Sequence, residues 1–161
     1  MVIVGLVLLY GYNAVKGLRE KQGQVNMIET ENELRNTIKT MSSDYDSLKT
    51  ERLQLPPNFK MICFASNTYL GTTGTDSGCS ITGNSLISNS DPKIKNSDNI
   101  IKDAITEKTA NIFLVPDGTI NYMVGNIQLQ GNKHCLCIPK TGNEAVFRIR
   151  GLGNGVEISS T

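Results

Sequence analysis

The sequence predicts an α+β fold: a long N-terminal hydrophobic and amphipathic helix, followed by a small antiparallel β-rich head stapled by disulfides. Three observations predict it. Residues 1–15 carry no charge and are densely apolar. No proline occurs before Pro56, and strong helix formers dominate residues 15–41. Short apolar segments, turn residues and four cysteines fill the rest of the chain. We therefore expect a hydrophobic helix and amphipathic stem over 1–43 and a globular head over 44–161.

The apolar N-terminal segment allows three interpretations. A cleavable secretory signal would place positive charge before the apolar run, and none precedes it. A single membrane anchor is the second; as a helix, residues 1–15 reach only ~22 Å, short of a ~30 Å hydrocarbon core. The cluster Lys16, Arg19 and Lys21 would also hold an anchored head in the cytoplasm.

The third interpretation, which we favour, is that this helix packs against copies of itself in a fibre. Protein neighbours then replace lipid, so the length requirement relaxes, and small residues allow close helix approach. The predicted polymerisation residues are apolar or small: Val2, Ile3, Val4, Gly5, Leu6, Leu8, Leu9 and Gly11.

The stem carries an apolar stripe at helical spacing, made of Leu34, Ile38, Met41 and Tyr45. Its C-terminal half is expected to lie on the head, whereas residues 1–25 are expected to contact neighbouring subunits. The helix is predicted to end near Ser42 and Ser43. Leu48 continues the stripe, but belongs equally well to a following strand.

The head is predicted to begin with a hairpin, in which strands over 51–55 and 59–65 flank a Pro-Pro-Asn turn. Residues 66–98 form a long Ser/Thr/Gly/Asn-rich loop, and Ser97 or Asp98 caps a short helix that reaches about Lys108. Short antiparallel strands then make a small, sandwich-like sheet with the helix on one side. These strands are expected over 111–115, 120–130, 134–138, 145–150 and 156–159.

The four cysteines are disulfide candidates. If Cys135 and Cys137 lie on one strand, both thiols point to the same face and reach separate partners. We favour Cys63 and Cys79 as those partners. A zinc site is the rival, although Cys63 and Cys79 are too far apart for a zinc knuckle, and free buried thiols are a third possibility. Disulfides imply an oxidising exterior, which argues against a cytoplasmic head.

The composition indicates neither an enzyme nor a nucleic-acid-binding protein. The net charge is +1, so the chain lacks the positive electrostatic potential that drives nucleic-acid binding. It also has only one histidine and four cysteines that could serve in catalysis or metal binding. His134 is expected to be structural, Asp44 and Asp46 match no EF-hand loop, and the glycine-rich stretch 151–155 is a turn. We therefore expect no catalytic residues, no metal, no cofactor and no nucleic-acid partner.

A hydrophobic N-terminal helix that continues into an amphipathic stem and a β-rich head resembles the type IV pilin superfamily. Gly5 stands where many bacterial pilins carry a glutamate, which favours the archaeal pilin and archaellin branch. The segments 53–64 and 135–138 are also similar to heads of uncharacterised, membrane-anchored archaeal surface proteins. The resemblance implies leader removal by a prepilin-type peptidase, residence in the membrane before assembly, and a helical homopolymer of identical subunits used in adhesion or motility. A monomeric, single-pass membrane-anchored surface binding module is the alternative.

Overall fold

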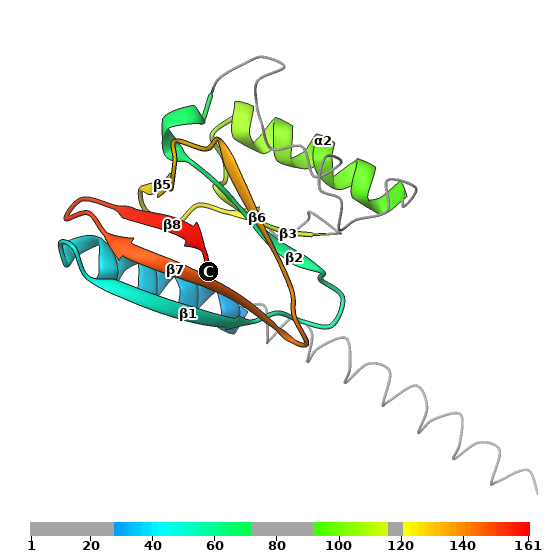
Figure 1. Ribbon diagram of the computed structural model, residues 1–161. Helices are drawn as coiled ribbons and strands as arrows, with labels where there is room; N and C mark the ends of the chain where they lie inside the picture. Colours follow the sequence, from blue (N-terminus) through cyan, green and yellow to red (C-terminus); the bar gives the residue numbers. More distant parts are fainter. Residues whose placement is uncertain (1–27, 72–91, 116–120) are drawn as a thin grey trace, which may run out of the picture.

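The computed structural model describes residues 28–71, 92–115 and 121–161. These residues form a mixed α+β structure with eight strands in two four-stranded sheets (Figure 1). The expected fold class is wrong in its main feature, because the described helices are short. One has 16 residues (28–43) and the other, α2 (Pro92–Thr106), has 15. In the described part of the chain, neither helix has the length and apolarity that a membrane crossing requires.

Sheet A has the strand order β1-β7-β8-β5, with β1 at Leu48–Gln54, β7 at Glu144–Gly151, β8 at Val156–Ser160 and β5 at Ile127–Leu129. Along β7, buried side chains alternate with exposed ones, so one face of the sheet is buried and the other meets solvent. The pair β5–β8 is parallel, so the expected purely antiparallel sheet is also wrong.

Sheet B has the order β4-β3-β2-β6 and is antiparallel throughout. Its strands are β4 (Asn121–Tyr122), β3 (Ile112–Val115), β2 (Met61–Ala65) and β6 (Cys135–Pro139). Every residue of β2 and β3 is buried, because both faces of this sheet are covered.

Sheet B is the middle layer of the molecule. Helix α2 packs on one face of it through Ile101, Ala104 and Ile105, which contact Met61, Phe113 and their neighbours. The other face shares a single apolar cluster with the inner face of sheet A and with helix 28–43 (Figure 1). At the centre of this cluster the rings of Phe64 (β2) and Phe147 (β7) lie 5.0 Å apart. Helix 28–43 is therefore part of the core.

Two predicted strand connections differ from the structure. The expected hairpin between 51–55 and 59–65 does not form: β1 pairs with β7, and β2 pairs with β3 and β6 in the other sheet. The predicted strand over 120–130 is divided into β4 and β5, which lie in different sheets. Helix α2 begins at Pro92, five residues before the expected cap at Ser97.

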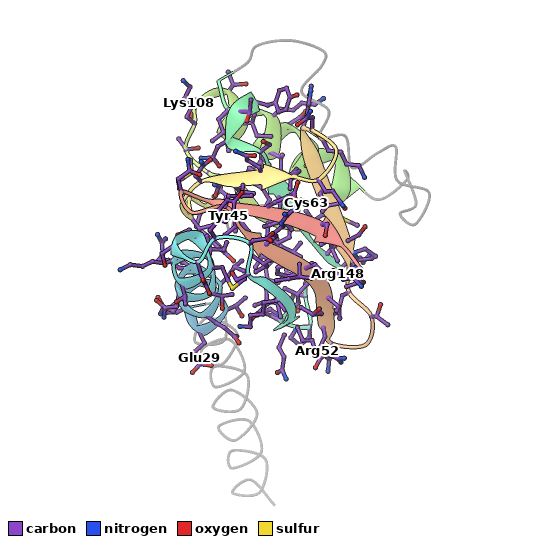
Figure 2. The ribbon with its side chains drawn as sticks, turned by 60° about the vertical axis from the view of Figure 1, so that its left-hand side comes forward. Glu29, Tyr45, Arg52, Cys63, Lys108 and Arg148 are labelled. Carbon is purple, nitrogen blue, oxygen red and sulfur yellow. A yellow bond between two sulfur atoms is a disulfide. The ribbon has the colours of Figure 1, made fainter. Side chains whose placement is uncertain are left out.

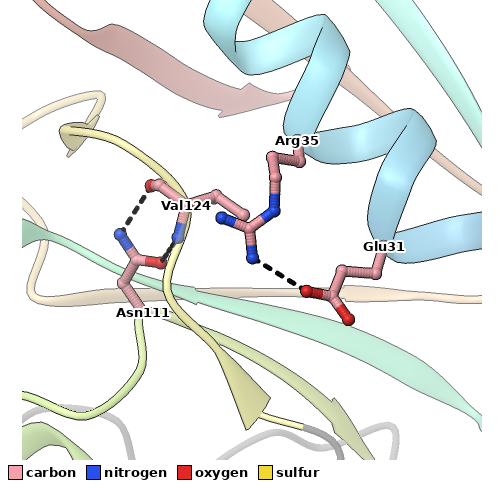
Figure 3. A network of polar contacts seen from close by, with 4 residues as sticks. All are labelled: Glu31, Arg35, Asn111 and Val124. Carbon is pink, nitrogen blue, oxygen red and sulfur yellow. Dashed lines mark hydrogen bonds and ion pairs between the residues drawn. The ribbon is translucent and has the colours of Figure 1, made fainter. Parts of the chain in front are cut away.

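The buried Asn111 and the half-buried Asn67 hold the chain where it passes from sheet B to sheet A. The Asn111 side chain is fully buried; its Nδ2 donates to the carbonyl of Val124 at 3.0 Å, and its Oδ1 accepts from the Val124 N–H at 2.9 Å (Figure 3). Asn67 Oδ1 accepts from Asn111 Nδ2 at 2.9 Å and from the Ile127 N–H at 3.0 Å. These bonds satisfy backbone groups that the break between β4 and β5 removes from the sheets.

Glycine is required where β7 meets the end of helix 28–43. A Cβ on Gly151 would lie 1.9 Å from the carbonyl oxygen of Asp44 and 2.3 Å from that of Met41. The close approach lets Gly151 form two backbone hydrogen bonds with the 44–47 turn. The Asp46 N–H donates to the Gly151 carbonyl at 2.9 Å, and the Gly151 N–H donates to the Ser47 carbonyl at 2.9 Å. The turn then directs the chain back along the helix as β1.

Candidate functional site

Cys63 and Cys137 form a disulfide, which is one of the pairings that the sequence favours. The two residues lie directly opposite each other on the antiparallel strands β2 and β6, with their Cα atoms 4.0 Å apart. Cys63 is fully buried among the residues that pack under α2, and Cys137 is half-buried beside them. The bond therefore fixes the edge strand β6 to the centre of sheet B.

Cys135 is also disulfide-bonded, and its side chain is half-buried beside the α2 cluster. It lies two residues before Cys137 on the same strand, so both side chains project from the same face of sheet B, as the alternation predicts. Cys79, the fourth candidate, lies outside the described residues, as do the predicted polymerisation residues from Val2 to Gly11.

The four residues of the predicted stem stripe differ in their burial. Leu34, Ile38 and Met41 are buried in the core that both sheets share. Tyr45 follows the end of the helix and is 77% exposed. Leu48 belongs to β1 and is exposed as well. The stripe therefore holds the described helix to the head, while Tyr45 and Leu48 add exposed apolar surface at one end of it.

Tyr122 is a buried polar residue that the sequence did not single out. Its hydroxyl has no hydrogen-bond partner among the described residues. Burial, and then the charge of Glu31, raise the pKa of Tyr122 above its ordinary value of 10.0, while Arg35 acts in the opposite direction. Glu31 and Arg35 pair with each other at 2.8 Å on the helix (Figure 3). Such a phenol contributes apolar packing rather than polar contacts.

We predict that Tyr122→Phe leaves the free energy of unfolding at pH 7 within about 0.5 kcal/mol of the wild-type value, because no hydrogen bond is lost. The raised pKa means that the folded state keeps its proton while the unfolded chain ionises, so wild-type stability falls as the pH rises above 10.0. Tyr122→Phe has no ionisable hydroxyl at this position, so its stability does not fall for this reason. Urea unfolding at pH 7 and above pH 10 measures both effects, with Tyr45→Phe as the matched exposed control. A cost above about 1 kcal/mol at pH 7 contradicts the prediction.

The outer face of sheet A carries a defined hollow. This hollow has a volume of about 340 Å³. Its lining residues are Asp46, Leu48, Gln130, Arg148, Arg150, Glu157 and Ser159.

Two arginines in this hollow differ in their surroundings. Arg150 donates to Asp46 through Nε at 2.8 Å and Nη2 at 2.6 Å, and this hydrogen bond raises the pKa of the Arg150 guanidinium. Glu157 lies opposite Arg150 on β8 and adds to the same effect. Arg148, labelled in Figure 2, is in contrast exposed. It makes no ion pair within the described residues. Its guanidinium fork is free to bind a carboxylate or phosphate in two-point fashion.

A second, larger hollow of about 540 Å³ lies at the opposite end of β1. It is lined by Glu29, Thr30 and Glu33 of the helix, by Arg52, by Gln54 to Pro57, and by Asn143. Thr30 Oγ1 donates to the carbonyl of Gln54 at 3.3 Å, which holds the helix beside the strand. Glu29 and Glu33 are exposed, one helical turn apart, and form no ion pair within the described part of the chain.

The part of the chain that the structure describes holds no cluster of side chains suited to bind a metal ion. No group of three His, Cys, Asp or Glu side chains gathers there. His134 stacks on Tyr69 with ring centroids 3.5 Å apart, next to Cys135. The alternation of Ala145, Phe147 and Ile149 with Arg148 and Arg150 was a signal from which the arginine-bearing face could have been found.

Comparison of the chain with protein-family models, curated proteins and solved structures finds no match.

Proposed function

We propose that this chain is the structural subunit of an extracellular filament, which assembles through its apolar N-terminal segment and displays the disulfide-bonded head. The observation that carries the proposal is a sequence of fifteen uncharged, mostly apolar residues placed before a head with a disulfide between β2 and β6. Disulfides persist outside the reducing cytoplasm, and an apolar segment of this size must be covered by lipid or by protein.

Protein neighbours are the cover that the segment fits better. Gly5 and Gly11, both within this apolar segment, permit close contact between neighbouring chains. Helix 28–43 is anchored on the head by Leu34, Ile38 and Met41, which gives the segment before it a firm attachment. The head on each subunit is then free to serve adhesion or motility.

Replacing Leu8 with Asp is expected to abolish filaments while the head still folds, because a carboxylate cannot be buried among apolar neighbours without a partner. Electron microscopy of the full chain after negative staining scores the filaments, and circular dichroism scores the fold. Leu8→Ile, which keeps the apolar volume, is the matched control and should assemble normally.

Normal filaments from Leu8→Asp contradict the proposal. Single copies that stay in detergent and never polymerise, in the wild type as in the variants, favour a monomeric, membrane-anchored surface binding module instead. The observation behind this second function is the same uncharged apolar segment, which lipid can cover as well as protein can, whereas Lys16, Arg19 and Lys21 count against it because they would hold the head in the cytoplasm.

A further inference from the structure

The large exposed apolar side chains of the described residues lie at two opposite ends of the unit formed by helix 28–43 and β1. Ile28, 60% exposed, lies at one end; Tyr45, 77% exposed, and Leu48, 67% exposed, lie at the other. The helix and β1 run antiparallel, since Thr30 contacts Gln54 at one end and the 44–47 turn connects them at the other. Figure 2 places Glu29 and Tyr45 at the two ends.

The charges at the two ends are complementary. Beside Ile28, the exposed Glu29 and Glu33 project from neighbouring turns of the helix and repel each other, because no described cation pairs with them. Beside Leu48, Asp46 and Glu157 both act on Arg150, which leaves Arg148 as an exposed cation without a counter-ion among the described residues. One end therefore offers unpaired carboxylates, and the other an unpaired guanidinium.

The hollow beside Leu48 is also large enough to admit a side chain from another molecule. Arg148 and Leu48 line the same hollow of about 340 Å³, which can receive one or two side chains. Arg148 lies opposite Thr50 on β1 and Ser159 on β8, so its neighbours across the strands are small and leave the guanidinium accessible. A carboxylate that enters from solvent can accept two hydrogen bonds from the Arg148 guanidinium, while an aliphatic side chain next to that carboxylate covers Leu48.

We propose that the hollow on the outer face of sheet A receives the N-terminal end of helix 28–43 from a second copy of this chain, with Glu29 and Glu33 of that copy paired to Arg148. The two surfaces are different patches on the same molecule, so the contact is heterologous. Each copy keeps one patch open for the next, and such contacts extend into an open polymer when the rotation between copies does not close a ring.

This inference rests on the proposed filament and names the contact between its heads. It also accounts for features that folding does not use: the adjacent carboxylates of Glu29 and Glu33, the unpaired Arg148, and the exposed Tyr45 and Leu48. Tyrosine and arginine are common among the residues that contribute most to binding in protein interfaces.

A charge swap in the full chain tests the contact. Arg148→Glu should raise the critical concentration for assembly, measured by sedimentation, by about tenfold, because it places like charges together in the interface. Combining Arg148→Glu with Glu29→Arg and Glu33→Arg should restore assembly to near the wild-type concentration. Lys102→Glu, the same charge change on the exposed side of α2, is the matched control and should assemble like the wild type.

The outcomes separate this contact from the filament itself. If the wild type forms no filaments, the proposed function fails and the contact fails with it. If Arg148→Glu assembles at the same concentration as the wild type and Lys102→Glu, only the contact is overturned. Loss of assembly in Arg148→Glu without recovery in the charge swap overturns the pairing of Arg148 with the two glutamates.

Discussion

Replacing Cys63 and Cys137 together with alanine is expected to lower the free energy of unfolding by about 4 kcal/mol. The bond joins residues 74 positions apart, so its loss releases a long loop in the unfolded chain and raises the entropy of that state. Removing both cysteines avoids leaving one thiol orphaned in the buried site under α2. Urea unfolding followed by circular dichroism, without reductant, measures the change.

A matched pair of small truncations separates this effect from general sensitivity to substitution. Thr50→Ala with Ser159→Ala changes one residue on each of the two strands that flank β7 on the outer face of sheet A. It breaks no covalent link, so it should cost about 0.5 kcal/mol or less. A cost below about 1 kcal/mol for the double cysteine variant would contradict the prediction, and would mean that the β2–β6 pairing alone fixes the edge strand.

The local elements were largely predictable from the sequence. The end of the stem helix, the burial of Leu34 and Ile38, and the alternation of strand 145–150 all follow from periodicity, because each pattern reports which side chains face an apolar layer. The long apolar N-terminal helix expected from the same reasoning is wrong, because the described helix spans only 28–43 and carries a single apolar stripe.

The pairing of strands was less predictable, for a physical reason. Pro56 and Pro57 suggested a hairpin between the strands that flank them, yet these strands have different surroundings. Strand β1 buries one face, so it suits an outer sheet; β2 is apolar at every position from Met61 to Ala65, so it needs cover on both faces. The continuous apolar run of β2 was thus a signal for the middle layer, and a turn signal alone could not reveal the change of sheet.

The candidate docking surface was hidden for a related reason. Arg148 and Arg150 are alike in sequence, and only the fold shows that Asp46, 104 positions before Arg150, pairs with one of them. The same holds for Glu29 and Glu33, whose relation to the hollow at the other end of β1 depends on how the helix lies beside the strand. Periodicity reports which face of an element is polar, but not which charges on that face find partners from distant parts of the chain.

Replacing Phe147 with alanine is expected to lower the free energy of unfolding by about 4 kcal/mol. The substitution leaves a cavity in the apolar layer that sheet A, sheet B and helix 28–43 share. Phe147 and Phe64 are both fully buried, and their rings meet at an interplanar angle of 59°, which suits an edge-to-face contact. Urea unfolding of the purified chain measures the loss.

Val146→Ala, one residue away on the outer face of β7, is the matched control and should cost about 1 kcal/mol or less, since its side chain is only half-buried. Combining Phe147→Leu with Phe64→Leu then measures the coupling between the two rings, expected at about 1 kcal/mol. Equal costs for Val146→Ala and Phe147→Ala would contradict the layer arrangement, because they would place both faces of β7 in similar surroundings. Unequal costs, with coupling across the two sheets, would confirm that the ring pair joins sheet A to the layer that carries the Cys63–Cys137 bond.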